Sequence, residues 1–194
     1  MEQLGQTTRG SDGVRQRIVA AALDELANRG LGASSVRTIA REAGVTAAMI
    51  NYYFGGKRAL YDTVVAEAQA RLHARLTAAL TGGASAARLA AAYFDFLAEE
   101  GQMQRLLLRE VLDGGSVPSA EVVGPLRDIL TTYFGGDEQA VQGALSLFGA
   151  IAGYFIYAPV LGELLGEDPL SPEALVRRRR HVIELARALE EANR

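Results

Sequence analysis

The stretch from residue 34 to residue 60 gathers side chains that can donate hydrogen bonds to phosphates and to the edges of bases. Arg37 carries a guanidinium that could donate two parallel hydrogen bonds to a guanine or hold a phosphate. Asn51 and Tyr52 add an amide and a phenol that can reach base edges or phosphates. Lys57, the only lysine of the chain, stands at the expected start of a helix, where free N–H groups also favour a phosphate. Together these residue types point to nucleic-acid recognition.

The apolar spacing around these side chains predicts two short helices, at about 35–43 and 46–53, joined by a tight turn. Gly44 stands where the chain must turn sharply, and glycine tolerates the positive φ that such a turn needs. Thr46 can cap the second helix through its hydroxyl. The inward residues of that helix follow i, i+3, i+4 spacing: Ile50, Tyr53 and Phe54. This is helix-turn-helix geometry, in which the second helix enters the major groove.

Small side chains at the start of the second helix fit this interpretation. Ala47 and Ala48 let the helix backbone approach the groove closely, and an alanine methyl can contact a thymine methyl. The candidate DNA-binding residues are therefore Arg37, Thr46, Ala47, Ala48, Asn51, Tyr52, Tyr53 and Lys57.

Charge is distributed unevenly along the chain. Residues 1–60 carry eight Lys or Arg and five Asp or Glu, a net charge of +3, whereas residues 61–194 carry twelve and eighteen, a net charge of −6. A basic N-terminal part on an acidic body favours a polyanion-binding end, although the whole chain has a net charge of −3.

The same stretch resembles the DNA-binding signature of the TetR family of regulators. Ser35 to Thr46 reads S-V-R-T-I-A-R-E-A-G-V-T, and Asn51 to Leu60 reads N-Y-Y-F-G-G-K-R-A-L. Three positions depart from the family pattern: Asn51 replaces the usual Tyr, Gly56 replaces the usual Ser or Asn, and Leu26 replaces a common Phe. Tyr53 matches a phosphate-contacting position of the family. The resemblance implies a homodimeric transcription factor, usually a repressor, that a small-molecule effector releases from a palindromic operator.

Helical periodicity dominates the whole chain, so the expected fold is all-α. We expect a flexible tail at 1–11, a three-helix helix-turn-helix domain at 12–60, and a helical effector-binding and dimerisation domain at 61–194. The helices are expected at about 13–28, 35–43, 46–53, 56–80, 85–100, 102–112, 119–134, 138–157 and 171–192, with glycine and proline between the later ones. Gly30 is expected to end the first of them.

The C-terminal domain supplies candidates for two further sites. Apolar and aromatic side chains, with one arginine in an apolar run, make the candidate effector site: Phe94, Leu97, Met103, Leu107, Arg109, Tyr133, Phe148 and Tyr154. The last two long helices of a TetR-like subunit commonly pair with those of a second subunit. The candidate dimer interface is accordingly Leu145, Gly149, Ala152, Gly153, Ile156, Val182, Leu185 and Leu189.

Residues 139–162 contain no charged side chain, and Gly149 and Gly153 form a G-x-x-x-G pattern that also occurs in membrane helices. Polar side chains within the run, Pro159 and acidic flanks without a cationic anchor favour a buried helix at a dimer interface instead. A membrane-anchored dimer is the alternative.

Enzymatic and metal sites are not expected. The chain has no cysteine, only two histidines, far apart, and none of the G-x-S-x-G, P-loop or H-E-x-x-H patterns. We therefore expect no catalytic residues, no metal and no cofactor. The N-terminus lacks an apolar signal region, which favours a cytoplasmic protein. The alternative function is a helical ligand-binding or scaffolding dimer that does not bind DNA.

Overall fold

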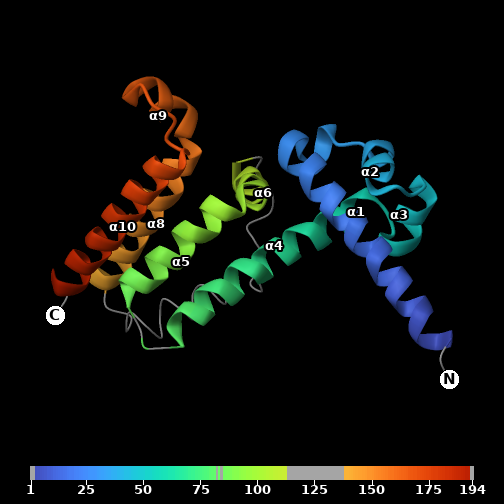
Figure 1. Ribbon diagram of the computed structural model, residues 1–194, viewed down its shortest axis with the longest axis horizontal. Coiled ribbons are helices and arrows are strands. Elements are labelled where there is room, and N and C mark those ends of the chain that lie inside the picture. Colours follow the sequence, from blue (N-terminus) through green and yellow to red (C-terminus); the bar gives the residue numbers. More distant parts are fainter. Residues whose placement is uncertain (1–2, 82, 84, 113–137, 193–194) are drawn as a thin grey trace. The chain divides into compact units, whose positions relative to one another are not determined.

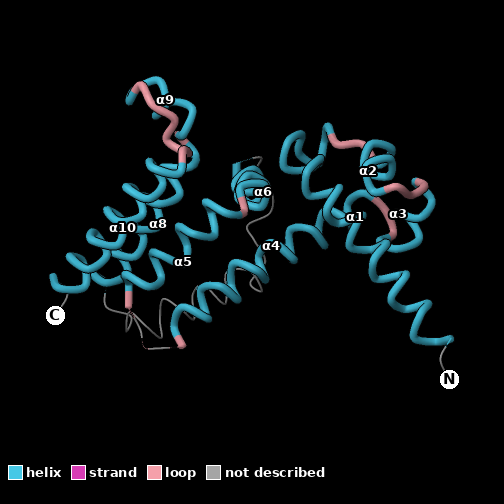
Figure 2. Tube along the Cα trace, viewed as in Figure 1, coloured by secondary structure: helices cyan, strands magenta, loops and turns pink. Residues whose placement is uncertain are grey.

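The computed structural model describes residues 3–81, 83, 85–112 and 138–192, and the described residues form helices with short connections and no strand (Figures 1 and 2). The expected all-α fold is confirmed. The helices are α1 (Gln3–Ala33), α2 (Val36–Ala43), α3 (Ala47–Phe54), α4 (Lys57–Leu80), α5 (Ala86–Glu99), α6 (Gly101–Leu112), α8 (Glu138–Ile156), α9 (Ala158–Leu165) and α10 (Pro172–Ala192). The helix expected at 119–134 lies outside the described residues.

The first helix is longer than the sequence predicts. It begins at Gln3, so residues 3–11 are helical where a tail was expected, because no proline in this segment interrupts the helix. At its other end, Gly30 leaves the helical conformation with φ 73° and ψ 171°. The chain then makes one more short helical stretch up to Ala33. Gly30 therefore ends the regular helix as predicted.

The chain divides into two compact units, which we describe separately. The first unit contains the described residues of 1–69 and 102–117, and the second those of 70–101 and 118–194. The first unit thus extends beyond the predicted boundary at residue 60, and it includes α6, which the sequence placed in the effector domain. The reason is packing: Leu106 of α6 is fully buried in the same core as Ile18 of α1.

The core of the first unit is made of apolar residues from α1, α2, α3, α4 and α6. Those with no exposed surface are Ile18, Ala22, Leu26, Ile39, Ile50, Leu60 and Leu106. Their spacing on α1, at 18, 22 and 26, is the helical stripe that the sequence predicts. Burying such a stripe holds the short α2 and α3, which could not be stable helices alone at eight residues each.

In the second unit, α10 packs against both α5 and α8. Phe94 and Phe96 of α5 are almost completely buried, and the Phe94 ring lies 5.2 Å from that of Phe155 on α8. Arg179 of α10 donates two hydrogen bonds to Asp95 of α5, at 2.6 and 2.8 Å. This bidentate contact fixes the orientation of α10 relative to α5. The hydrogen bonds to Asp95 also raise the pKa of the Arg179 guanidinium.

The sequence predicts an irregular segment after Pro159, but the structure has the helix α9 there, at an angle of 75° to α8. Pro159 lies in the first turn of α9, where its missing N–H costs no intrahelical hydrogen bond. The proline therefore starts a new helix after the bend, and Gly166, with φ 68°, ends it.

Candidate nucleic-acid interface

The turn between α2 and α3 is built by the residues that the sequence singled out. Gly44 has φ 65° and ψ 40°, and its N–H is directed at the carbonyls of Ala40 and Arg41. The Val45 N–H donates to the Ala40 carbonyl at 2.9 Å, and the Thr46 hydroxyl accepts from the Met49 N–H at 3.4 Å. The predicted left-handed glycine and the predicted threonine cap are therefore confirmed. They give α3 a fixed start immediately after α2.

The two faces of α3 differ sharply. Ile50 is fully buried, and Tyr53 and Phe54 are half-buried against the core, as the i, i+3, i+4 spacing predicts. On the outer face, Ala48 and Asn51 are exposed and Tyr52 is 84% exposed. Ala47, also predicted to face outward, is half-buried against the core. The outer face therefore presents a methyl group, an amide and a phenol.

Arg37, exposed on α2, differs from the other arginines between residues 12 and 69. Within the described residues its guanidinium makes no hydrogen bond or ion pair. The others are engaged: Arg15 with Glu67, Arg17 with the Ala43 carbonyl, Arg29 with Glu25, Arg41 with Glu42, and Arg58 with Asp62. Binding an anion through Arg37 would therefore break no contact inside the unit.

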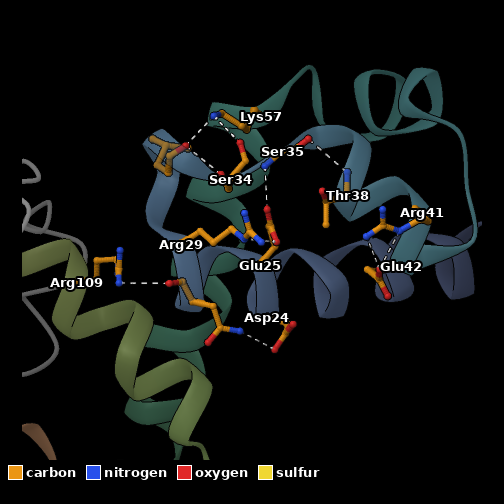
Figure 3. A network of polar contacts seen from close by, with 12 residues as sticks. Asp24, Glu25, Arg29, Ser34, Ser35, Thr38, Arg41, Glu42, Lys57 and Arg109 are labelled. Atoms are coloured by element: carbon orange, nitrogen blue, oxygen red, sulfur yellow. Dashed lines mark hydrogen bonds and ion pairs between the residues drawn. The ribbon is translucent and has the colours of Figure 1, made fainter.

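Lys57 has a different position from the one the sequence suggests. Its Nζ donates to the carbonyls of Leu31, Ser34 and Gly32, at 2.7, 3.1 and 3.4 Å. Figure 3 shows the contact with Ser34. An ammonium has three donors, so these three carbonyls use its capacity. The side chain ties the start of α4 to the end of α1 and to Ser34, which follows it. Its predicted phosphate contact stays a prediction, and this anchoring role is one that the sequence analysis missed.

Glu25 is a second positioning residue that sequence reasoning missed. It is 8% exposed, and its carboxylate accepts from the Ser35 N–H at 3.1 Å and pairs with Arg29 (Figure 3). Ser35 in turn caps α2, its hydroxyl accepting from Thr38. A signal was present, because residue 25 falls on the apolar stripe of α1, seven positions after Ile18. A carboxylate at such a position needs a partner in the interior.

Replacing Lys57 by methionine is expected to lower the free energy of unfolding by about 2 kcal/mol. The three carbonyls lose a charged donor, and hydrogen bonds to charged groups contribute about 1.5–3 kcal/mol. Chemical denaturation followed by circular dichroism would measure the change. Arg58→Met is the matched control, because the exposed Arg58–Asp62 pair contributes roughly 0.5 kcal/mol. Equal losses in both variants would contradict the anchoring role.

Comparison with known proteins assigns the N-terminal part of the chain to a family. Residues 18–64, which run from α1 into α4, match the model of the bacterial regulatory proteins of the tetR family. This N-terminal part of the chain therefore belongs to the TetR family. The HTH-type transcriptional regulator BetI of Vibrio parahaemolyticus is 35% identical over 66 residues, and that of Vibrio campbellii 36% over 62 residues. These matches cover 34% and 32% of this chain, and only 33% and 31% of the relatives, about a third of their length.

The fold of the family extends over nearly the whole chain. A TetR-like transcriptional regulator from Rhodococcus sp. RHA1 superimposes with a TM-score of 0.68 at 20% identity, covering 91% of this chain and 96% of that one. A structure from Streptomyces coelicolor gives a TM-score of 0.66 at 24% identity, covering 91% and 97%. At such identities the likeness concerns the fold alone.

The predicted effector residues are divided between the two units. Phe94, Leu97, Phe148 and Tyr154 are in the second unit, Met103, Leu107 and Arg109 are in the first, and Tyr133 lies outside the described residues. Leu107 packs against the core of the first unit, and Arg109 donates to the Asn28 carbonyl at 3.5 Å. The structure therefore does not bring these residues together within one unit, and the effector site stays a prediction.

Within the second unit, two of the predicted effector residues take part in aromatic contacts. Phe148, 53% exposed, stacks on Tyr93 with ring centroids 5.1 Å apart, and burial raises the pKa of the Tyr93 phenol. The Tyr154 hydroxyl donates to the Pro169 carbonyl at 2.6 Å, and Arg178 lies over the Tyr154 ring. Of these two rings, that of Phe148 has the larger exposed fraction.

The predicted dimer-interface residues differ in how far their own subunit buries them. Val182 has no exposed surface, because its own subunit buries it, and its place at the interface stays a prediction. Leu145 and Gly149 are exposed on α8, whereas the remaining five are half-buried: Ala152, Gly153, Ile156, Leu185 and Leu189. A side chain added at Gly149 would meet nothing within 4 Å, so nothing inside the subunit requires glycine there.

Among the described residues, no single helix has the length and apolar character needed to cross a membrane. Val141–Ile156 and Ala158–Leu165 meet that criterion only when taken together, with a bend of 75° between them.

Proposed function

We propose that this protein is a DNA-binding transcriptional regulator that acts as a homodimer in the cytoplasm and has no enzymatic activity. The observation that carries the proposal is the outer surface of α2 and α3. There Arg37 is exposed and unpaired within the described residues, and Asn51 and Tyr52 project beside a small Ala48. The buried core of the first unit holds α2 and α3 in place, and Arg37, Asn51 and Tyr52 are not part of that core.

In this proposal α3 enters the major groove and Arg37 holds a phosphate or a guanine. The BetI proteins of the two Vibrio species, which are named transcriptional regulators, match about a third of this chain and support the proposal. In a homodimer the two helix-turn-helix units would meet successive major grooves about 34–36 Å apart on a palindromic operator.

We further propose that a small-molecule effector binds the helical body and releases the protein from DNA, so that it acts as a repressor. A modest coupling of about 1–3 kcal/mol between the effector and DNA sites would suffice. Helix α4 is the natural lever. It begins at Lys57, whose ammonium three carbonyls at the end of α1 and at Ser34 hold, and it continues beyond residue 69 into the second unit.

The test is fluorescence anisotropy of the purified protein on DNA from upstream of its own gene, with scrambled DNA as control, across a salt series. Tight, sequence-selective binding that weakens steeply with salt is the expected result. If that fragment does not bind selectively, selection from random DNA follows. A protein that selects no sequence there would be the scaffolding or ligand-binding dimer instead.

Arg37→Ala is expected to weaken operator binding about 10- to 100-fold, because a hydrogen bond to a charged group contributes about 1.5–3 kcal/mol. The salt slope should also fall if Arg37 holds a phosphate. Anisotropy titrations measure both quantities. Arg41→Ala is the matched control: it removes the same charge from the same helix, but its guanidinium is already bound to Glu42 at 3.0 Å. Similar losses in the two variants would show that only net charge matters.

A further inference from the structure

The side-chain amide of Asn51 is an exposed polar group that takes no part in holding α2 and α3 together. Its backbone carbonyl accepts from the Gly55 N–H at 2.8 Å, but its carboxamide has no hydrogen-bond partner among the described residues. The side chain itself is exposed. An uncommitted carboxamide with one acceptor and two donors offers a paired recognition edge.

The neighbours of Asn51 on α3 determine what this edge can reach. Side chains on a helix lean toward its N-terminus and cover the turn three and four residues earlier. For Asn51 those positions are Ala48 and Ala47, which carry only methyl groups. The amide therefore lies toward the end of α3 that starts at the Thr46 cap, and no bulky side chain there keeps a base pair away.

We propose that Asn51 is a specificity-determining residue that reads an adenine in each operator half-site, an inference that rests on the proposed DNA-binding function. The adenine N6 amino group donates to Asn51 Oδ1, and Asn51 Nδ2 donates to adenine N7. Guanine has acceptors at both N7 and O6, so it can accept from Asn51 Nδ2 but offers no donor to Asn51 Oδ1. Ala48, exposed one turn earlier on the same face, contacts the methyl group of a thymine in or next to that base pair.

Asn51 stands where a tyrosine is usual in the family, and the two side chains differ in what they can recognise. A phenol has a single hydroxyl and a long reach, whereas an asparagine is short and presents two groups side by side. The shorter side chain needs a close approach of the helix backbone to the base, which the methyl-sized side chains of Ala47 and Ala48 permit. We therefore expect base discrimination at this position and no contribution to the salt dependence.

The experiment first selects the operator from random DNA with the wild-type protein. Each adenine of the selected half-site is then replaced by 7-deazaadenine, which lacks the N7 acceptor. The wild-type protein should lose about tenfold in affinity at one adenine of the half-site. Asn51→Ala should lose a similar factor on the unmodified operator and be insensitive to the replacement at that adenine. Its salt slope should equal that of the wild type.

The outcomes separate the inference from the function on which it rests. If every 7-deazaadenine has the same effect on the wild type and on Asn51→Ala, Asn51 reads no adenine and the inference is overturned while DNA binding stands. If no sequence is selected at all, the proposed function fails. Asn51→Asp tests the chemistry further. A carboxylate only accepts, so preference at the position should move toward cytosine, whose amino group donates. Retained adenine preference in Asn51→Asp would also overturn the inference.

Discussion

Leu106→Ala is expected to lower the free energy of unfolding of the first unit by about 3 kcal/mol, within the range of about 2–5 kcal/mol for such truncations of buried leucines. Leu106 is on α6, far in sequence from the helix-turn-helix, yet it has no exposed surface and lies in the same core as Ile18 and Ile50. Removing its side chain leaves a cavity in the core that also buries Ile39 of α2 and Ile50 of α3. Chemical denaturation monitored by circular dichroism would measure the loss.

Leu164→Ala is the matched control, since it makes the same chemical change at a leucine that is 75% exposed. Its effect should stay within about 0.5 kcal/mol, as for most surface substitutions. If Leu106→Ala costs no more than the control, α6 does not belong to the core of the first unit. Anisotropy with operator DNA should show weaker binding by Leu106→Ala at temperatures where its first unit begins to unfold.

The position of α6 also bears on regulation. Gln102 donates to Asp24 at 2.7 Å and Arg109 to the Asn28 carbonyl, so α6 is bound to α1 by polar contacts as well as by Leu106. The chain enters the first unit again at residue 102, after α5. In the proposed mechanism, an effector that moved α5 would therefore act on the helix-turn-helix through α6 as well as through α4.

Local patterns made much of the interface predictable. The helix-turn-helix follows from the apolar spacing within α2 and α3, from Gly44 and from the Thr46 cap, because each depends on residues within one or two turns. The role of Lys57 was not predictable in this way, since the carbonyls that it binds are 23 to 26 residues earlier in the chain. Leu106 was missed for the same reason. The apolar residues around Leu106 are compatible with the core of either unit, and only the tertiary packing shows that Leu106 belongs to the first.

Gly149→Glu is expected to turn the proposed dimer into monomers, raising its dissociation constant at least about 100-fold. A lone carboxylate buried at an interface costs about 3–5 kcal/mol, and each 1.4 kcal/mol is a factor of ten. Gly149 is exposed on α8 beside Leu145, which is 52% exposed, and the space around it is open within the subunit. Sedimentation velocity across a concentration series would measure the dissociation constant.

Misfolding would not explain monomers in this variant. Glycine inside a helix is unfavourable by roughly 0.5–1 kcal/mol relative to alanine, so a residue with a side chain at position 149 should leave the isolated subunit at least as stable. Ala74→Glu, at an exposed position of α4, is the matched control and should remain a dimer. If Gly149→Glu also stays dimeric at low micromolar concentration, the exposed face of α8 is not the interface. Monomeric Gly149→Glu should in turn bind a half-site and a full palindrome almost equally, since only a dimer can join two half-sites in one binding event.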